Sequence, residues 1–145
     1  MKKQSVLFVC LGNICRSPAA EAIFLDLINK KGLNNSFIVD SAGTGSWHIG
    51  KKADTRMRIA SRKRGVEIFS RARQINSNDF EKFNYIVAMD DSNYENIIDM
   101  KSRKSLSDFA SIKKIQNFRS IFQEIEVPDP YFGGDKGFDS VLDIL

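Results

Sequence analysis

The sequence has 145 residues, 42% of them hydrophobic, and a formal net charge of +4. This size is typical of one domain with its own core, so we expect residues 1–145 to form a single domain. No apolar stretch approaches the roughly 20 residues that a membrane span needs. Because Gly12, Asn13 and Arg16 interrupt the first apolar run too early for a signal peptide, we expect a cytoplasmic protein with no membrane partner.

The chain contains two cysteines and one histidine, and the two cysteines, Cys10 and Cys15, lie close together. In a cytosolic protein such cysteines are more often catalytic, redox-active or metal-binding than structural. Two cysteines and His48 make a poor set of zinc ligands. We therefore expect neither a metal ion nor any other cofactor.

Basic residues are concentrated between Lys51 and Arg73, where only Asp54 and Glu67 oppose them. Such a segment forms either a solvated helix face or a surface that attracts anionic, phosphorylated partners. No nucleic-acid-binding motif accompanies the charge, so we expect no nucleic-acid partner.

The first forty residues predict a βαβ unit. The apolar run within Gln4–Val9 predicts a buried strand. Ser17 is expected to cap the following helix, with Pro18 at its first position and Gly32 at its end. A second strand is expected over Phe37–Val39. The helix has one apolar face, made of Ala20, Ile23, Phe24, Leu27 and Ile28.

Two further helices are expected before a third strand. Asp54 is expected to cap a helix that reaches Arg64 and stops at Gly65, and Ser77 or Asn78 to open a short one. Tyr85–Met89 predicts the third strand.

The last third of the chain is expected to hold one more helix and one more strand before its end. Ser92 is expected to open the helix, and the fourth strand is expected within Lys114–Phe122. A loop over Val127–Gly134 and a final helix over Phe138–Leu145 complete the prediction.

The alternation of strands and helices predicts an α/β fold with a parallel sheet covered on both faces. Folds of this kind bind ligands at the carboxyl ends of their strands, near a switch in strand order. Cys10 follows the first predicted strand directly and therefore lies at the expected position of a site.

The segment from Cys10 to Pro18 contains a cysteine, five residues, an arginine and a hydroxyl residue. This spacing allows successive backbone N–H groups to converge on one anion at the start of a helix. Gly12 and Asn13 are the residues best suited to left-handed backbone angles there. The expected phosphate-binding backbone comprises Leu11, Gly12, Asn13, Ile14, Cys15 and Arg16.

Arg16 is expected to bind two phosphoryl oxygens through its planar guanidinium group. The positive potential of the loop N–H groups, the helix N-terminus and Arg16 favours the thiolate form of Cys10. A thiolate can attack phosphorus without a histidine base. The hydroxyl of Ser17 is expected to form a hydrogen bond with that thiolate. An ordinary buried cysteine would explain neither Arg16 nor the Ser-Pro start of the helix.

A phosphate ester also needs a proton for its leaving group, and Asp129 is the candidate donor. Pro128 and Pro130 flank it and stiffen its loop. A general acid requires accurate positioning first and a suitable pKa second. An Asp between two prolines is usually a turn residue. The prediction that Asp129 is catalytic therefore depends on its combination with the segment Cys10–Pro18.

Together these segments resemble the low-molecular-weight protein-tyrosine-phosphatase family. Residues 40–47, 72–74 and 88–90 also match it in order, so the resemblance covers nearly the whole chain. It implies a three-layer sandwich with a four-stranded parallel sheet flanked by helices. It also implies hydrolysis of phosphotyrosine-containing proteins through a phosphocysteine on Cys10, with inorganic phosphate as the product.

The resemblance implies roles for further residues. Asn13 would hold the shape of the loop, and Ile14, Trp47 and Tyr131 would line the substrate pocket. Many relatives carry a histidine near Ser70 that supports the phosphate loop, and this chain lacks it. Relatives also usually continue past the position of Leu145, so we expect the final helix to be cut short. We expect a monomer.

Three alternatives use the same loop or part of it. An arsenate reductase of this fold needs a further cysteine downstream, and none follows Cys15. Phosphoarginine phosphatases of the family typically have threonine where Ile14 stands. A module that only binds phosphoproteins would keep Arg16 but would need neither Cys10 nor Asp129.

Overall fold

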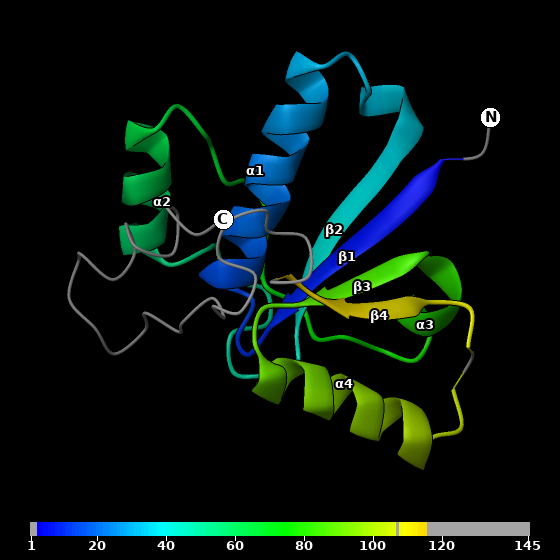
Figure 1. Cartoon of the computed structure of the whole chain (residues 1–145). Coiled ribbons are helices and arrows are strands. Elements are labelled where there is room, and N and C mark those ends of the chain that lie inside the picture. The colour runs from blue at the N-terminus through cyan, green and yellow to red at the C-terminus, as the bar shows by residue number, and fades with distance from the viewer. Residues whose placement is uncertain (1–2, 107, 116–145) are drawn as a thin grey trace.

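The computed structural model of the chain describes residues 3–106 and 108–115, which form a parallel four-stranded sheet in the order β2-β1-β3-β4 (Figure 1). The predicted α/β fold with four parallel strands is therefore confirmed. The strands are β1 (Gln4–Cys10), β2 (Phe37–Gly43), β3 (Tyr85–Ala88) and β4 (Ser111–Lys114).

Helices cover both faces of the sheet and produce three layers (Figure 1). The helices are α1 (Arg16–Lys30), the 3-10 helix η1 (Asn34–Ser36), α2 (Thr55–Lys63), α3 (Asp79–Lys82) and α4 (Asp91–Arg103). One apolar cluster joins β1 to α1 and α2, and a second joins β1 and β3 to α3 and α4. No helix within the described part of the chain is long and apolar enough to cross a membrane.

The alternation of side chains along β1 distributes it between the two clusters. Val6, Phe8 and Cys10 belong to the cluster beneath α1, whereas Leu7 and Val9 belong to the cluster above α4. All five side chains are buried, as expected for the central strand of a sheet covered on both faces. Consequently the Cys10 sulfur points to the side where α1 begins.

The order of the strands places a ligand site at the end of β1. The chain passes from β1 through α1 to β2 on one side of β1, and β3 then pairs with β1 on its other side. The chain connections therefore run to opposite sides of β1, and no crossover covers the carboxyl end of this strand. Cys10 is the last residue of β1, opposite Gly43 of β2.

The starts of two helices differ from the prediction. Helix α1 begins at Arg16 with Cys15 as its N-cap, so Ser17 is not the cap and Pro18 is the third helical residue. The Ser17 hydroxyl forms hydrogen bonds with Cys10, Asn13 and the Ala42 carbonyl instead of with the backbone of its own helix. For α4, Asp90 rather than Ser92 is the N-cap, because its carboxylate accepts the Asn93 N–H at 2.7 Å.

The prediction for the fourth strand was wrong. Strand β4 covers Ser111–Lys114 and not a segment within Lys114–Phe122. Ile112 is its only strongly apolar residue, so an edge strand of this composition produces a weak sequence signal. The predicted loop Val127–Gly134 and helix Phe138–Leu145 lie outside the described residues.

Most other boundaries agree with the prediction within a few residues. Asp54 caps α2 by accepting the Arg56 N–H at 2.8 Å, and the chain turns at Gly65 with a φ of 80°. Gly32 ends α1 with a φ of 69°. Strand β2 extends to Gly43, four residues beyond the predicted Val39, and this extension brings residues 40–43 to the edge where Cys10 lies.

Candidate active site

The Cys10 sulfur lies in a polar environment at the end of an otherwise apolar strand. The side chain is 2% exposed, and its Sγ atom is 3.0 Å from the Ser17 Oγ. The backbone N–H of Asn13 donates to the same sulfur at 3.3 Å. These contacts place hydrogen-bond donors around Cys10 at the N-terminus of α1, where the helix dipole also favours negative charge.

Asn13 fixes the shape of the loop between β1 and α1. Its φ of 58° is left-handed, a conformation that asparagine adopts more readily than most residues. Its side-chain amide donates to Ser17 Oγ at 2.8 Å, and its carbonyl oxygen accepts the Arg73 N–H at 2.9 Å. The side chain is 1% exposed. A single buried amide thus connects the loop to α1 and to residue 73.

Carbonyl groups of the loop point outward, because three of them accept N–H groups from the segment that follows β2. The pairs are Cys10 with Thr44, Leu11 with Gly45, and Ile14 with Asp54, at 2.9, 2.9 and 2.8 Å. A chain that directs its carbonyls outward can direct its N–H groups toward a common centre. An anion nest requires this outward arrangement of the carbonyls.

Gly43 permits this close approach of loop and strand. A Cβ atom there would lie 2.7 Å from the Leu11 carbonyl oxygen, a contact that backbone atoms cannot relieve. Gly12 differs from the expectation, because among the described loop residues only Asn13 has a positive φ. At Gly12 a Cβ would instead approach the His48 ring to 3.0 Å.

Arg16 lies at the first turn of α1 and is held by a carboxylate from the opposite side of the sheet. Its side chain is 3% exposed, and its Nη1 donates to the Asp90 Oδ2 at 2.6 Å. Asp90 also caps α4 through its other oxygen. A guanidinium group carries its five N–H donors in a fixed planar arrangement, so this contact orients the whole Arg16 side chain.

A second ionic network, centred on Arg73, contacts the loop through Asn13. Arg73 pairs with Asp79 at 3.0 Å and with Asp40 at 3.1 Å, while its backbone N–H binds Asn13. Burial alone would lower the pKa of Arg73, but the two carboxylates raise it above its ordinary value. The Arg73 guanidinium group therefore stays charged, and its ion pairs fix the position of the Arg73 backbone N–H, which binds Asn13.

Of the three predicted pocket residues, Ile14 belongs to the loop between β1 and α1, and Trp47 lies in the segment after β2 that contacts this loop. Ile14 is 8% exposed, whereas Trp47 is 68% exposed and its ring lies against Gly45. Tyr131 and the predicted acid Asp129 lie outside the described residues. Within residues 3–106 and 108–115, no group of three or more His, Cys, Asp or Glu side chains could hold a metal ion.

The family model for low molecular weight phosphotyrosine protein phosphatases matches residues 5–145 of this sequence. The chain belongs to this family. A protein of that name from Schizosaccharomyces pombe is 44% identical over 138 residues, which span 94% of this chain and 86% of the relative. These values extend the similarity well beyond the cysteine loop.

Solved structures of the family have the same fold. A protein tyrosine phosphatase from Entamoeba histolytica matches with a TM-score of 0.88 at 46% identity, covering 98% of this chain and 89% of the other. A Drosophila arginine phosphatase matches with a TM-score of 0.86 at 36% identity, covering 98% and 88%. The three-layer fold is thus shared by family members whose names indicate different substrates.

The sequence did not predict a role in the site for either Arg73 or Asp90. The position of Asp90 near the site could have been predicted. It follows the third strand, whose carboxyl end lies at the same edge of the parallel sheet as Cys10. The contact between Arg73 and Asn13 could not be predicted, since it uses the backbone N–H of Arg73, which is 60 residues away in sequence.

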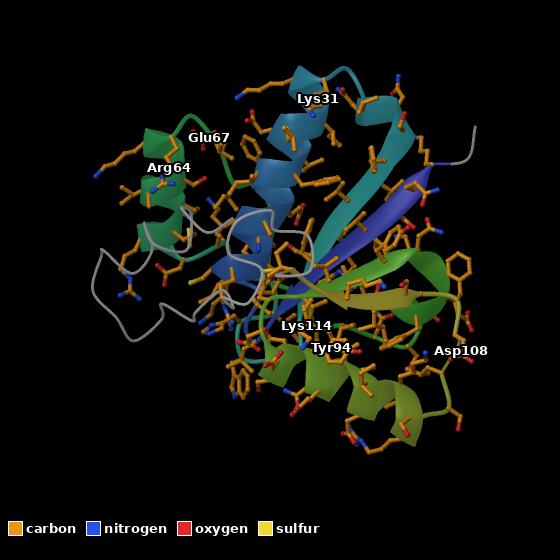
Figure 2. All side chains as sticks on the ribbon, viewed as in Figure 1. Lys31, Arg64, Glu67, Tyr94, Asp108 and Lys114 are labelled. Carbon is orange, nitrogen blue, oxygen red and sulfur yellow. The ribbon has the colours of Figure 1, made fainter. Side chains whose placement is uncertain are left out.

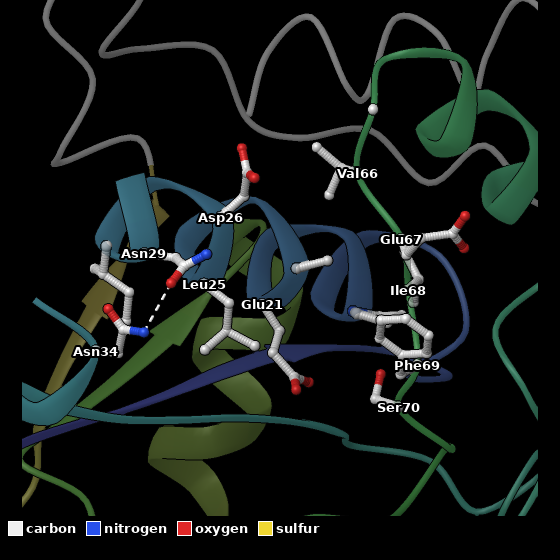
Figure 3. A pocket seen from close by; sticks show the side chains of 14 residues that line it. Glu21, Leu25, Asp26, Asn29, Asn34, Val66, Glu67, Ile68, Phe69 and Ser70 are labelled. Atoms are coloured by element: carbon white, nitrogen blue, oxygen red, sulfur yellow. Dashed lines mark hydrogen bonds between the residues drawn. The ribbon is translucent and has the colours of Figure 1, made fainter. Parts of the chain in front are cut away.

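Ser70 faces Glu21 of α1 and forms a hydrogen bond with it (Figure 3). Both residues line a hollow of about 450 Å³ between α1 and residues 65–70 (Figure 3). Burial raises the pKa of Glu21, while the hydrogen bond from Ser41 lowers it, the charge of Asp40 raises it, and the hydrogen bond from Ser70 lowers it. The net shift is upward from 4.5.

This shift predicts the pH dependence of Glu21→Gln. With a raised folded pKa, the folded protein keeps the Glu21 proton at pH values where the unfolded chain has lost it. Stability therefore falls as the pH rises from 4.5 through the folded pKa. We expect Glu21→Gln to remove this loss, so its stability relative to wild type should be higher at pH 7 than at pH 4.5, measured by urea unfolding.

The matched control is Glu95→Gln on α4, an exposed carboxylate, which should show no such difference between the two pH values. A Glu21→Gln variant whose relative stability falls toward neutral pH would contradict the raised pKa.

Proposed function

We propose that this chain hydrolyses phosphotyrosine in proteins, using Cys10 as the nucleophile and releasing inorganic phosphate. The observation that carries the proposal is the set of donors on the Cys10 sulfur at the N-terminus of α1. A thiolate in that position faces the centre of the anion nest. A phosphoryl group bound there would meet the sulfur directly, and family membership supports the same activity.

Ser17 can support both protonation states of the sulfur. Its oxygen already accepts a hydrogen bond from Asn13, so its single O–H is directed to one of two acceptors. The Ala42 carbonyl lies at 3.3 Å and the Cys10 sulfur at 3.0 Å. When Cys10 is a thiolate, we expect the Ser17 O–H to donate to it, which stabilises the charge.

The first step forms the phosphocysteine. The Cys10 thiolate attacks phosphorus, the S–P bond forms, and the bond between phosphorus and the tyrosine oxygen breaks. The leaving oxygen takes its proton from the Asp129 carboxyl group, so tyrosine departs as a neutral phenol. Arg16 and the loop N–H groups bind the equatorial oxygens of the phosphoryl group, where charge is carried in the transition state.

The second step restores the enzyme. A water molecule attacks phosphorus and transfers a proton to the Asp129 carboxylate, while the S–P bond breaks. Inorganic phosphate leaves, and Cys10 returns as a thiolate beside Ser17. Asp129 thus acts first as acid and then as base, and the reaction consumes only water.

The reaction requires reduced cysteines, and this requirement supports a cytoplasmic location. Cys10 and Cys15 are both buried, and neither forms a disulfide. An oxidising compartment would convert a reactive thiolate to disulfide or sulfenic acid. We propose that the protein acts in the cytoplasm, as a monomer and without a cofactor.

Two other activities of this fold remain distinguishable from the proposed one. The only cysteines in the chain are Cys10 and Cys15, so an arsenate reductase would lack its downstream cysteine. The similarity to an arginine phosphatase concerns the shared fold, whereas Ile14 stands where that group typically has threonine. Hydrolysis of a phosphotyrosine peptide faster than the matched phosphoarginine peptide is the expected outcome.

Arg16→Lys tests whether catalysis needs the planar, two-pronged geometry of the guanidinium group in addition to its positive charge. Lysine keeps the cation near Asp90 but cannot bind two phosphoryl oxygens in parallel. We expect kcat/KM for p-nitrophenyl phosphate to fall at least about 10²-fold, or about 2.7 kcal/mol of transition-state stabilisation. The control is Arg62→Lys on α2, where Arg62 forms an exposed ion pair with Glu67; this variant should keep nearly the wild-type rate. Equal rates for wild type and Arg16→Lys would show that charge alone is sufficient.

Asp129→Asn tests the general acid. A tyrosine leaving group, with a pKa of about 10, needs protonation far more than an acidic nitrophenol. We expect the variant to lose roughly 10²–10⁴-fold in kcat/KM on aryl phosphates with poor leaving groups, and much less on activated esters. The measurement is kcat/KM against leaving-group pKa, under conditions where phosphorylation of Cys10 limits the rate.

In that series, wild type should be nearly insensitive to the leaving-group pKa and the variant steeply sensitive. Parallel lines for the two enzymes would mean that Asp129 only shapes its loop and that another group donates the proton.

A further inference from the structure

A groove of about 600 Å³ begins at the phosphate loop and follows α4. Leu11 lies at its near end, directly after Cys10. Segments 44–47 and 74–77 form one wall, and α4 from Asn96 to Lys104 forms the other. Because Asp90 at the start of α4 contacts Arg16, the helix leads away from the candidate site, as its course in Figure 1 also shows.

The lining of the groove combines an apolar floor with polar walls. Ile97 and Ile75 are buried at 0% and 6% exposure. Exposed amide and hydroxyl side chains, including Asn76, Ser77 and Asn96, can bind the polar groups of an extended backbone. Gln74 donates to the Thr44 carbonyl at 3.2 Å, which ties the two segments of one wall together.

The far end of the groove is positively charged. Arg103 pairs with Asp99 at 2.8 Å, so the charges of these two residues balance. Lys104 is the exposed C-cap of α4. No ion pair of Lys104 occurs among the described residues, and Lys104 therefore leaves one uncompensated positive charge at this end of the groove.

The length of the groove matches a short stretch of polypeptide. From Asn96 to Lys104 the helix rises by about 12 Å, at about 1.5 Å per residue. An extended chain advances about 3.3 Å per residue, so this wall spans about four residues. A chain anchored by its phosphotyrosine at Cys10 could therefore pass Leu11 and Trp47 and place its next residues along α4.

We propose that this groove binds the segment of a substrate protein that flanks its phosphotyrosine, and that Lys104 selects an acidic side chain in that segment. The inference rests on the proposed phosphatase activity and deepens it, because it concerns which phosphorylated segments reach Cys10. A small aryl phosphate does not extend into the groove, so the two proposals can be tested separately.

The test compares phosphotyrosine peptides in which a single Glu is moved one position at a time along both sides of the phosphotyrosine. We expect wild type to favour Glu at one distant position by about three- to fivefold in kcat/KM, as for an exposed ion pair, and to lose the preference at high salt. Lys104→Glu should abolish or reverse that preference. Its kcat/KM for p-nitrophenyl phosphate should remain at the wild-type value.

The matched control is Lys31→Glu, which reverses another exposed lysine at a helix C-cap, on the end of α1 remote from α4 (Figure 2). It should leave the peptide preference intact. A second variant, Asn96→Trp, should obstruct the groove and lower kcat/KM for every peptide but not for p-nitrophenyl phosphate.

The outcomes separate the two proposals. A peptide profile without positional preference, or equal effects of Lys104→Glu and Lys31→Glu, would overturn the groove while the phosphatase activity stood. Failure of wild type to turn over both p-nitrophenyl phosphate and the peptides would overturn the proposed function and the groove together.

Discussion

The geometry of the site depends on one buried amide. Asn13 adopts a left-handed conformation, donates from its side chain to Ser17, and accepts the backbone N–H of Arg73. Its own N–H meets the Cys10 sulfur. A buried amide with its partners satisfied adds little net stability, but each partner lost would leave an unsatisfied polar group that costs about 1–3 kcal/mol. The loop therefore has one well-defined shape.

Segments that are distant in sequence converge on this amide because the strands are parallel. The carboxyl ends of β1, β2 and β3 meet at one edge and bring Cys10, Gly43 and Asp90 into one neighbourhood. Asp90 then holds Arg16 from the start of α4, while the backbone N–H of Arg73 binds Asn13. The loop between β1 and α1 is thus held by contacts from two segments that are distant in sequence.

Only part of this structure could be predicted from the sequence. The buried strands β1 and β3 and the cap of α2 were predictable, because apolar runs and capping residues are local signals. Ser17 was misassigned as a helix cap, since the rule for caps is local and the partners of its hydroxyl are Cys10, Asn13 and Ala42. Strand β4 was misplaced because its residues are mostly polar and its position depends on pairing with β3.

Candidate residues of the loop were predictable from their spacing, but their supports were not. The role of Asp90 depends on its 2.6 Å contact with Arg16 across 74 residues, and that of Arg73 on a backbone group. The contacts of Glu21 with the hydroxyl groups of Ser41 and Ser70 likewise became clear only in the fold, because they join residues from three separate segments.

The central claim is that a phosphoryl group is transferred to the Cys10 sulfur. Its most direct test is rapid acid quenching of the enzyme during turnover of a phosphotyrosine peptide, followed by peptide mapping by mass spectrometry. We expect one phosphoryl group on the peptide that contains Cys10, and none in the Cys10→Ser variant. Phosphate found on another residue, or continued turnover by Cys10→Ser near the wild-type rate, would contradict it.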